Sequence, residues 1–244
     1  HAQPQPHHPA SSSPSSSPSF RPVAMASGEP RTVSWKAVHE LRWLRLCVVS
    51  YVDGNGRERQ WEAAVRTTRQ EATPAAAKVD GVAILAVLRS RRRPPRLLLV
   101  KQFRPPMSCK TIELPAGMVD EGESPVQAAM RELKEETGYT ASAADARTSE
   151  PVCLSPGITN ESVCLVQVEV DADAPENLAP KQELEESESI RVLEVPLRSL
   201  AAELDRQVAS GACVFGGVRM LCMGLEMGQK SVRVHISAYA VATL

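Results

Sequence analysis

Residues 113–139 have the sequence ELPAGMVDEGESPVQAAMRELKEETGY, which predicts a glycine loop followed by a charged helix. Ser124, Pro125 and Gln127 mark the start of this helix: a serine N-cap, a proline at the first helical position and a capping-box partner. Gly138 predicts the end of the helix, because glycine readily takes the left-handed conformation found after a C-cap. The stretch therefore predicts a strand end, a loop and one helix of about thirteen residues, close to the average helix length.

This helix brings three carboxylates together. Glu132 and Glu136 are one turn apart, and Glu135 lies beside them. Carboxylates this close repel one another unless a cation neutralises them, and their hard oxygens suit Mg²⁺ or Mn²⁺ shared with substrate phosphates. A solvated acidic helix face is the simpler interpretation for the glutamates alone. Their fixed offsets from the glycine loop and from the helix caps favour a metal site.

The spacing resembles the Nudix box, G-x5-E-x7-R-E-U-x-E-E-x-G-U, starting at Gly117. Every fixed letter is present, and Tyr139 stands at a final position that is normally aliphatic. The resemblance implies metal-dependent cleavage of a diphosphate linked to another moiety. It also implies an α/β fold: an α/β/α sandwich with a mixed sheet, preceded by an N-terminal β-subdomain.

Segments outside the box are similar to the ADP-ribose and ADP-sugar pyrophosphatase branch of this family. They are WE at 61–62, RTTR at 66–69, VKQFRPP at 100–106 and SPG at 155–157, and the similarity spans residues 41–227. The branch implies hydrolysis of ADP-ribose and related ADP-sugars to AMP and a sugar phosphate. It also implies a homodimer with shared active sites. Two alternatives stay open: hydrolysis of oxidised guanine nucleoside diphosphates, and an ADP-ribose-binding module without catalysis.

The resemblance assigns the metal ligands and catalytic groups by position. The Mg²⁺ ligands, or those of Mn²⁺, would be the Ala116 carbonyl and the carboxylates of Glu132, Glu135, Glu136 and Glu188. Glu135 and Glu188 are the expected catalytic glutamates, with Glu185 and Glu186 as close alternatives to Glu188. Arg131 would act by pairing with Glu123 and Glu135 and so fixing their side chains.

The resemblance also assigns substrate contacts. They are Trp43, Trp61, Glu62, Arg66, Arg104, Met118 and Ser155. The two tryptophans would sandwich the adenine, one from each subunit, and Arg104 would meet the diphosphate. The competing interpretation is that both tryptophans fill a core, which is the more usual place for this residue.

Composition limits the other functions. The chain has 244 residues and a net charge of −1, which gives no electrostatic argument for nucleic-acid or membrane-surface partners. No apolar run approaches the ~20 residues of a membrane span. Six cysteines without CxxC spacing predict a reduced compartment and no zinc site. We expect a cytoplasmic protein, with the nucleus as an alternative; the Ser-rich head is a weak signal for organelle targeting.

Four segments are expected along the chain. They are a disordered Pro/Ser-rich tail (1–34), the N-terminal β-subdomain (35–75), the Nudix domain (76–229) and a C-terminal extension (230–244). Strands are expected at 41–52, 57–67, 81–88, 97–103, 163–170 and 190–195, and helices at 196–209 and 214–227. A DGNG turn at 53–56 predicts a hairpin, the basic run at 89–96 an exposed turn, and the extension shows strand-like alternation.

Overall fold

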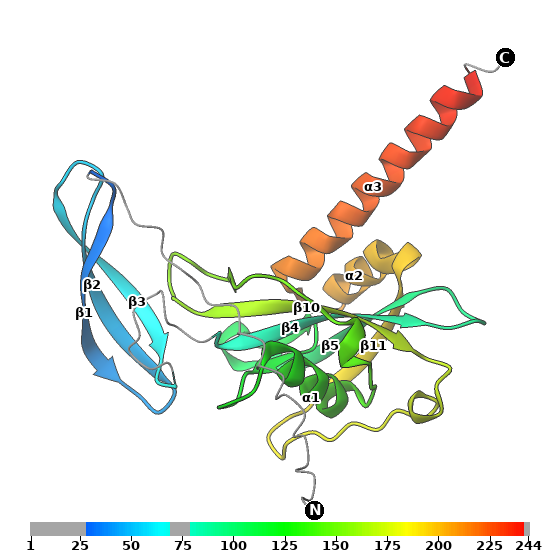
Figure 1. The fold of residues 1–244 in the computed structure, drawn as a ribbon, viewed down its shortest axis with the longest axis horizontal. Helices are drawn as coiled ribbons and strands as arrows, with labels where there is room; N and C mark the ends of the chain where they lie inside the picture. Colours follow the sequence, from blue (N-terminus) through cyan, green and yellow to red (C-terminus); the bar gives the residue numbers. More distant parts are fainter. Residues whose placement is uncertain (1–27, 69–78, 242–244) are drawn as a thin grey trace, which may run out of the picture.

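The structure, a computed structural model, describes residues 28–68 and 79–241 and contains two separate sheets (Figure 1). The first sheet is antiparallel with three strands: β1 (Arg31–Glu40), β2 (Leu44–Val52) and β3 (Glu58–Arg66). The predicted hairpin is confirmed, since Asp53 accepts backbone hydrogen bonds from Asn55 and Arg57 across the turn. Strand β1 was not expected, and the boundary of the tail at residue 34 is wrong. Residues 31–34 pair with β2, and the rest of the predicted tail, 1–27, lies outside the described residues.

The second sheet is mixed and has nine strands. They are β4 (Gly81–Arg89), β5 (Arg96–Arg104), β6 (Cys109–Glu113), β7 (Ala116–Met118), β8 (Arg147–Thr148), β9 (Val152–Cys153), β10 (Ser162–Asp171), β11 (Arg191–Pro196) and β12 (Cys213–Val214). Strand β10 runs parallel to β4, whereas β5 and β7 pair with β4 in the antiparallel sense.

Helices cover both faces of this sheet, as the α/β/α prediction requires. Helix α1 (Pro125–Thr137) packs on one face, and α2 (Leu200–Ala209) with α3 (Gly216–Val241) packs on the other (Figure 1). Strand β4 shows why its sequence is an unbroken apolar run. Val82 and Ile84 face the α1 side, whereas Ala83 faces α2 and α3, so both faces are buried.

The C-terminal region differs from the sequence prediction. Helix α2 begins at Leu200, after a 3-10 turn at Leu197–Ser199. Residues 213–214 form strand β12 beside β6, and α3 then runs from Gly216 to Val241, so the strand-like pattern after residue 230 is wrong. No described strand pairs with that segment, and a helix needs no partner for its hydrogen bonds. Among the described residues, no helix combines the length and hydropathy needed to cross a bilayer.

Candidate active site

The helix that carries the glutamates is fixed at both ends by its own sequence. The Ser124 side chain accepts from the Gln127 backbone N–H at 3.3 Å, and the Gln127 side chain accepts from the Ser124 N–H at 2.9 Å. Gly138 ends the helix at φ +78°, where a Cβ would overlap the Lys181 backbone. Both caps were predicted and both are confirmed.

The first glycine of the box is needed because Glu132 packs over it. Strand β7 passes beneath α1, and a Cβ added at Gly117 would fall 1.9 Å from the Glu132 carboxylate. The three heavy atoms nearest to that Cβ all belong to Glu132. The Glu132 carboxylate can therefore keep this position only if residue 117 has no side chain.

Arg131 is the centre of an ion-pair cluster. Its guanidinium donates to Glu123 at 2.9 and 3.1 Å, to Glu135 at 3.1 Å and to Glu132 at 2.7 Å. It also donates to the carbonyl of Met118, a β7 residue that pairs with Gly81 of β4, at 3.0 Å. These carboxylates raise the pKa of Arg131, with Glu123 the largest influence, so its charge is permanent. The predicted pairing with Glu123 and Glu135 is confirmed.

Glu136 is placed differently from the other box glutamates. Its side chain is buried, with 4% of the residue exposed, and accepts from the Ala116 N–H at 3.0 Å. Burial, with smaller contributions from the carboxylates of Glu132 and Glu188, raises the pKa of Glu136 to about 8. Burial also raises the pKa of Glu132. Of the predicted ligands, the structure shows a direct contact between Glu136 and the residue Ala116, through the Ala116 backbone N–H.

The chemistry of this donor set fits a hard divalent cation. Partly buried carboxylates beside a backbone carbonyl are the oxygen ligands that Mg²⁺ and Mn²⁺ prefer, and a cation would offset their repulsion. Within the described part of the chain, no three His, Cys, Asp or Glu side chains are grouped closely enough to hold a metal ion. Glu132 is instead paired with Arg131, so binding a cation there requires this side chain to turn.

Arg104 and Glu188 both lie near enough to Glu136 to influence it electrostatically. Glu136 and Glu188 both raise the pKa of Arg104 electrostatically, although the largest influence is Glu113, which accepts from Arg104 at 2.9 and 2.8 Å. Glu188 accepts from the Glu185 N–H at 3.1 Å, which holds its loop. Glu113 was not predicted as a site residue. The available signal was strand alternation, which places Arg104 and Glu113 on one face of the β5–β6 hairpin.

The loop after β9, which belongs to the main domain, contacts strand β3 of the N-terminal sheet. The Trp61 indole N–H donates to the Gly157 carbonyl at 2.9 Å, and Arg66 pairs with Glu161 at 2.7 Å. The Ser155 carbonyl accepts the backbone N–H groups of Ile158 and Thr159 and shapes this loop. The three segments predicted around Trp61, Arg66 and Ser155 are thus brought together. Glu161 is a further member, the ion-pair partner of Arg66, whose role the sequence did not indicate.

The two tryptophans are exposed, so the core interpretation is wrong for both. Trp43 is 60% and Trp61 53% exposed. Trp61 lies opposite Val49 in β2, whereas Trp43 lies in the bend before β2, six residues earlier in the chain than Val49. Glu62 projects to the opposite face from Trp61 and shares a face with Arg66, because side chains alternate along a strand.

Comparison with known proteins settles the family. Residues 77–210, more than half of the chain, match the NUDIX domain. The chain belongs to the Nudix family. Its Nudix relatives include a Saccharomyces cerevisiae protein named ADP-ribose pyrophosphatase, 38% identical over 218 residues, covering 86% of this chain and 91% of the yeast protein.

Two further comparisons agree with the Nudix assignment. A Mus musculus protein named ADP-sugar pyrophosphatase is 35% identical over 178 residues, covering 73% of this chain and 78% of the mouse protein. The solved structure of an ADP compounds hydrolase superposes with a TM-score of 0.53 at 19% identity, covering 75% of this chain and 86% of that one. At this identity the last comparison shows the fold, and the chain is a Nudix hydrolase by its family.

Proposed function

We propose that the protein hydrolyses the diphosphate bond of ADP-ribose and related ADP-sugars, yielding AMP and a sugar phosphate, with Mg²⁺ as cofactor. The observation that carries this proposal is the buried Glu136 held by the Ala116 N–H, with Arg104 and Glu188 within electrostatic reach of it. The names of the yeast and mouse relatives support the choice of ADP-ribose and ADP-sugars.

Each side chain has a distinct part in this reaction. Bound Mg²⁺ would neutralise the diphosphate and lower the pKa of a coordinated water. Glu132, Glu136 and the Ala116 carbonyl would hold the cation, and Arg131 would keep the neighbouring carboxylates in place. Glu188 or Glu135 would accept the proton of the attacking water. Arg104 would stabilise the charge of the diphosphate oxygens without changing its own protonation.

A substrate panel tests the reaction. Rates with ADP-ribose, ADP-glucose and 8-oxo-dGDP in Mg²⁺, and then in Mn²⁺, should be highest for ADP-ribose. Glu136→Gln should lower turnover at least about 100-fold, because it removes one negative ligand oxygen from the cation site. Glu121→Gln is the matched control, since Glu121 is an exposed carboxylate in the loop between β7 and α1. Faster cleavage of 8-oxo-dGDP would support the oxidised-nucleotide alternative, and tight ADP-ribose binding without turnover would support a binding module.

We also propose a homodimer in which the N-terminal sheet of one subunit completes the site of its partner. Large apolar side chains cover the described surface of this sheet: Val33, Trp35, Val38, Leu41, Trp43, Leu44, Leu46 and Trp61 are each at least 45% exposed. These side chains lie on both faces of the sheet, since Leu44 and Leu46 are on the face opposite to Trp61. So much exposed apolar surface is typical of an interface with another protein. The different positions of Trp43 and Trp61 along the sheet agree with an adenine sandwich that takes one indole from each subunit.

Mixing two inactive variants tests the shared site. A heterodimer of Glu136→Gln and Trp61→Ala subunits should recover part of the activity, because one of its two sites is then intact. If the mixed dimers form but regain no activity, both residues belong to the site of one subunit. If light scattering shows that the protein is a monomer, the proposal is wrong. For the cellular location we propose the cytoplasm, and fractionation of the tagged full chain would distinguish this from the nucleus.

A further inference from the structure

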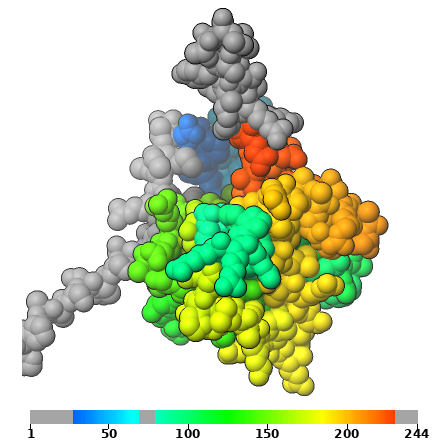
Figure 2. All heavy atoms as spheres, turned by 90° about the vertical axis from the view of Figure 1, so that its right-hand side faces the viewer, coloured from blue at the N-terminus to red at the C-terminus, as the bar shows by residue number. Residues whose placement is uncertain are grey.

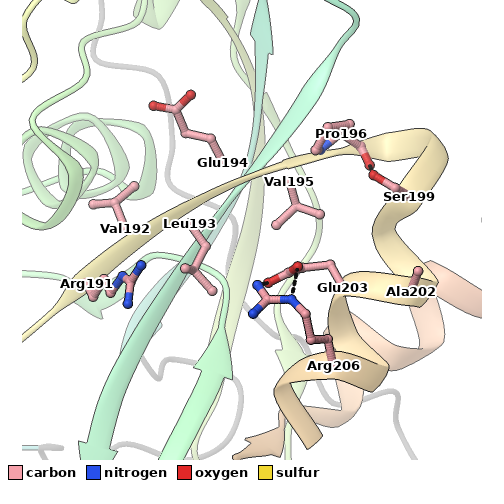
Figure 3. Close-up of a pocket in the computed structure, with 10 residues that line it drawn as sticks. All are labelled: Arg191, Val192, Leu193, Glu194, Val195, Pro196, Ser199, Ala202, Glu203 and Arg206. Carbon is pink, nitrogen blue, oxygen red and sulfur yellow. Dashed lines mark hydrogen bonds and ion pairs between the residues drawn. The ribbon is translucent and has the colours of Figure 1, made fainter. Parts of the chain in front are cut away.

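The groove between β11 and α2 lies apart from the proposed active site and has no assigned role. It has a volume of about 460 Å³ and is lined by all six residues of β11 together with Ser199, Ala202, Glu203 and Arg206 (Figure 3). None of these residues is among the predicted metal ligands or substrate contacts. Figure 2 views the molecule from this end, where the β4–β5 hairpin projects toward the viewer beside the gold residues of α2.

One edge of β11 is unpaired in the described structure. The strand pairs with β5 over six consecutive residues, from Arg191 opposite Lys101 to Pro196 opposite Arg96, without a bulge. No other described strand pairs with it. In an antiparallel pair about half of the backbone N–H and C=O groups point away from the partner strand, so β11 offers a row of free donors and acceptors to the groove.

The α2 side of this groove carries a net positive charge. Arg191 and Lys101 are opposite each other and therefore project from the same face of the sheet, where Lys101 donates to Gln207 at 2.6 Å. Glu203 is the carboxylate on this side, and it accepts from Arg206 at 3.0 and 2.6 Å. Within residues 28–68 and 79–229, the guanidinium of Arg191 forms no hydrogen bond or ion pair.

The carboxylate on the other face of β11 does not cancel the net positive charge on the α2 side. Glu194 projects toward α1, where it accepts from the Tyr139 hydroxyl at 2.6 Å and pairs with Arg96. Figure 3 shows Glu194 pointing away from Glu203 and Arg206, whereas Leu193 lies between Arg191 and that pair. An entering ligand therefore meets the partly exposed apolar side chain of Leu193 and the unpaired cation Arg191, whereas Val195 belongs to the buried core.

We propose that the free edge of β11 binds an extended peptide segment of a partner protein by strand addition, with an acidic side chain of that segment against Arg191. Backbone hydrogen bonds to β11 supply the affinity, and an apolar side chain of the segment covers Leu193. A small anion would need only the cationic end of the groove, whereas the free backbone of the whole strand suits a peptide. This surface does not depend on the proposed hydrolysis of ADP-ribose.

Fluorescence anisotropy with the full chain tests this proposal. The probe is a labelled peptide Ser-Val-Thr-Leu-Thr-Glu, whose alternation matches β11 in the antiparallel sense. Two matched peptides accompany it: one ends in Lys in place of Glu, and one is N-methylated at alternate amides so that it cannot complete a strand ladder. The acidic peptide should bind saturably, the Lys peptide at least about tenfold more weakly, and the N-methylated peptide not at all.

Two protein variants complete the test. Arg191→Glu should reverse the preference so that the Lys peptide binds more tightly than the Glu peptide. Arg198→Glu changes the net charge equally but lies outside the groove lining, and it should leave the affinities within about twofold. No saturation by about 1 mM peptide, equal binding of the N-methylated peptide, or equal effects of the two variants would each overturn the proposal. Unchanged ADP-ribose turnover in both variants confirms that they are folded.

Discussion

Replacing Gly117 by alanine should disable the active site by displacing one carboxylate. The added Cβ would lie 1.9 Å from the Glu132 carboxyl group, so that group has to move by about 1.5 Å to regain ordinary van der Waals contact. Gly117 has no positive φ, and the backbone itself therefore tolerates alanine. We expect a loss of about 1–3 kcal/mol in the free energy of unfolding from overpacking. We also expect turnover to fall on the order of 100-fold, because misplacement by about 1 Å has this effect on catalysis.

The assay pairs urea unfolding with ADP-ribose turnover, and a double-mutant cycle identifies the cause. In a Glu132→Ala background the atoms nearest to the new Cβ are gone, so Gly117→Ala should cost little further stability. Gly224→Ala is the control: its Cβ meets open space in α3, and it should raise stability by about 0.5–1 kcal/mol without affecting turnover. Equal costs of Gly117→Ala in the two backgrounds would refute the argument, as would wild-type turnover of the single variant.

Three further results are expected. Glu113→Gln should raise KM more than it lowers kcat, because Arg104 loses its ionic bidentate partner but keeps its charge; Arg104→Gln should then be the more severe variant, and equal effects would contradict this positioning role. In chelator-treated protein the free energy of unfolding should fall as pH rises from about 4.5 to 8, since folded Glu136 retains a proton that the unfolded chain releases; Glu136→Gln should flatten this slope in pH-resolved denaturation. Tyr139→Phe should cost about 1–2 kcal/mol in thermal unfolding, because the buried hydroxyl that donates to Glu194 is lost, with turnover unchanged.

Local sequence signals predicted the central part of the fold. The caps at Ser124 and Gly138 fix α1 within its own thirteen residues, so no distant contact was needed to place it. The apolar run of β4 likewise identified a strand buried on both faces. In contrast, β1 is exposed on every residue and is defined by pairing with β2, which a hydrophobic pattern cannot reveal. The helix α3 continues through an alternating segment because no described strand pairs with it there.

The candidate site was predictable to the extent that its residues follow a spacing. Arg131 and the box glutamates lie on one helix, and their contacts follow from helical geometry. Partners from other elements were missed for the same reason: Glu113 and Glu161 meet their arginines only after β5, β6 and the loop at residues 155–161 are in place. The exposure of Trp61 was also hidden, since the sequence cannot show whether an indole is covered by its own chain or by a partner.

The arrangement of charges explains why the box needs one arginine and several glutamates. Arg131 directs its donors to Glu123, Glu132, Glu135 and the Met118 carbonyl, and its single positive charge also pairs with Asp120 at 3.8 Å, so four carboxylates share it. The Glu136 carboxylate accepts a backbone N–H, but among the described residues it forms no ion pair with an arginine. It is nevertheless the most deeply buried of the four box glutamates. Burial therefore disfavours the charged form of Glu136 without an ion-pair partner to offset it, and the pKa of Glu136 rises. Of the box carboxylates, Glu136 consequently gains most from a bound cation, and cation binding and the folded position of α1 should stabilise each other.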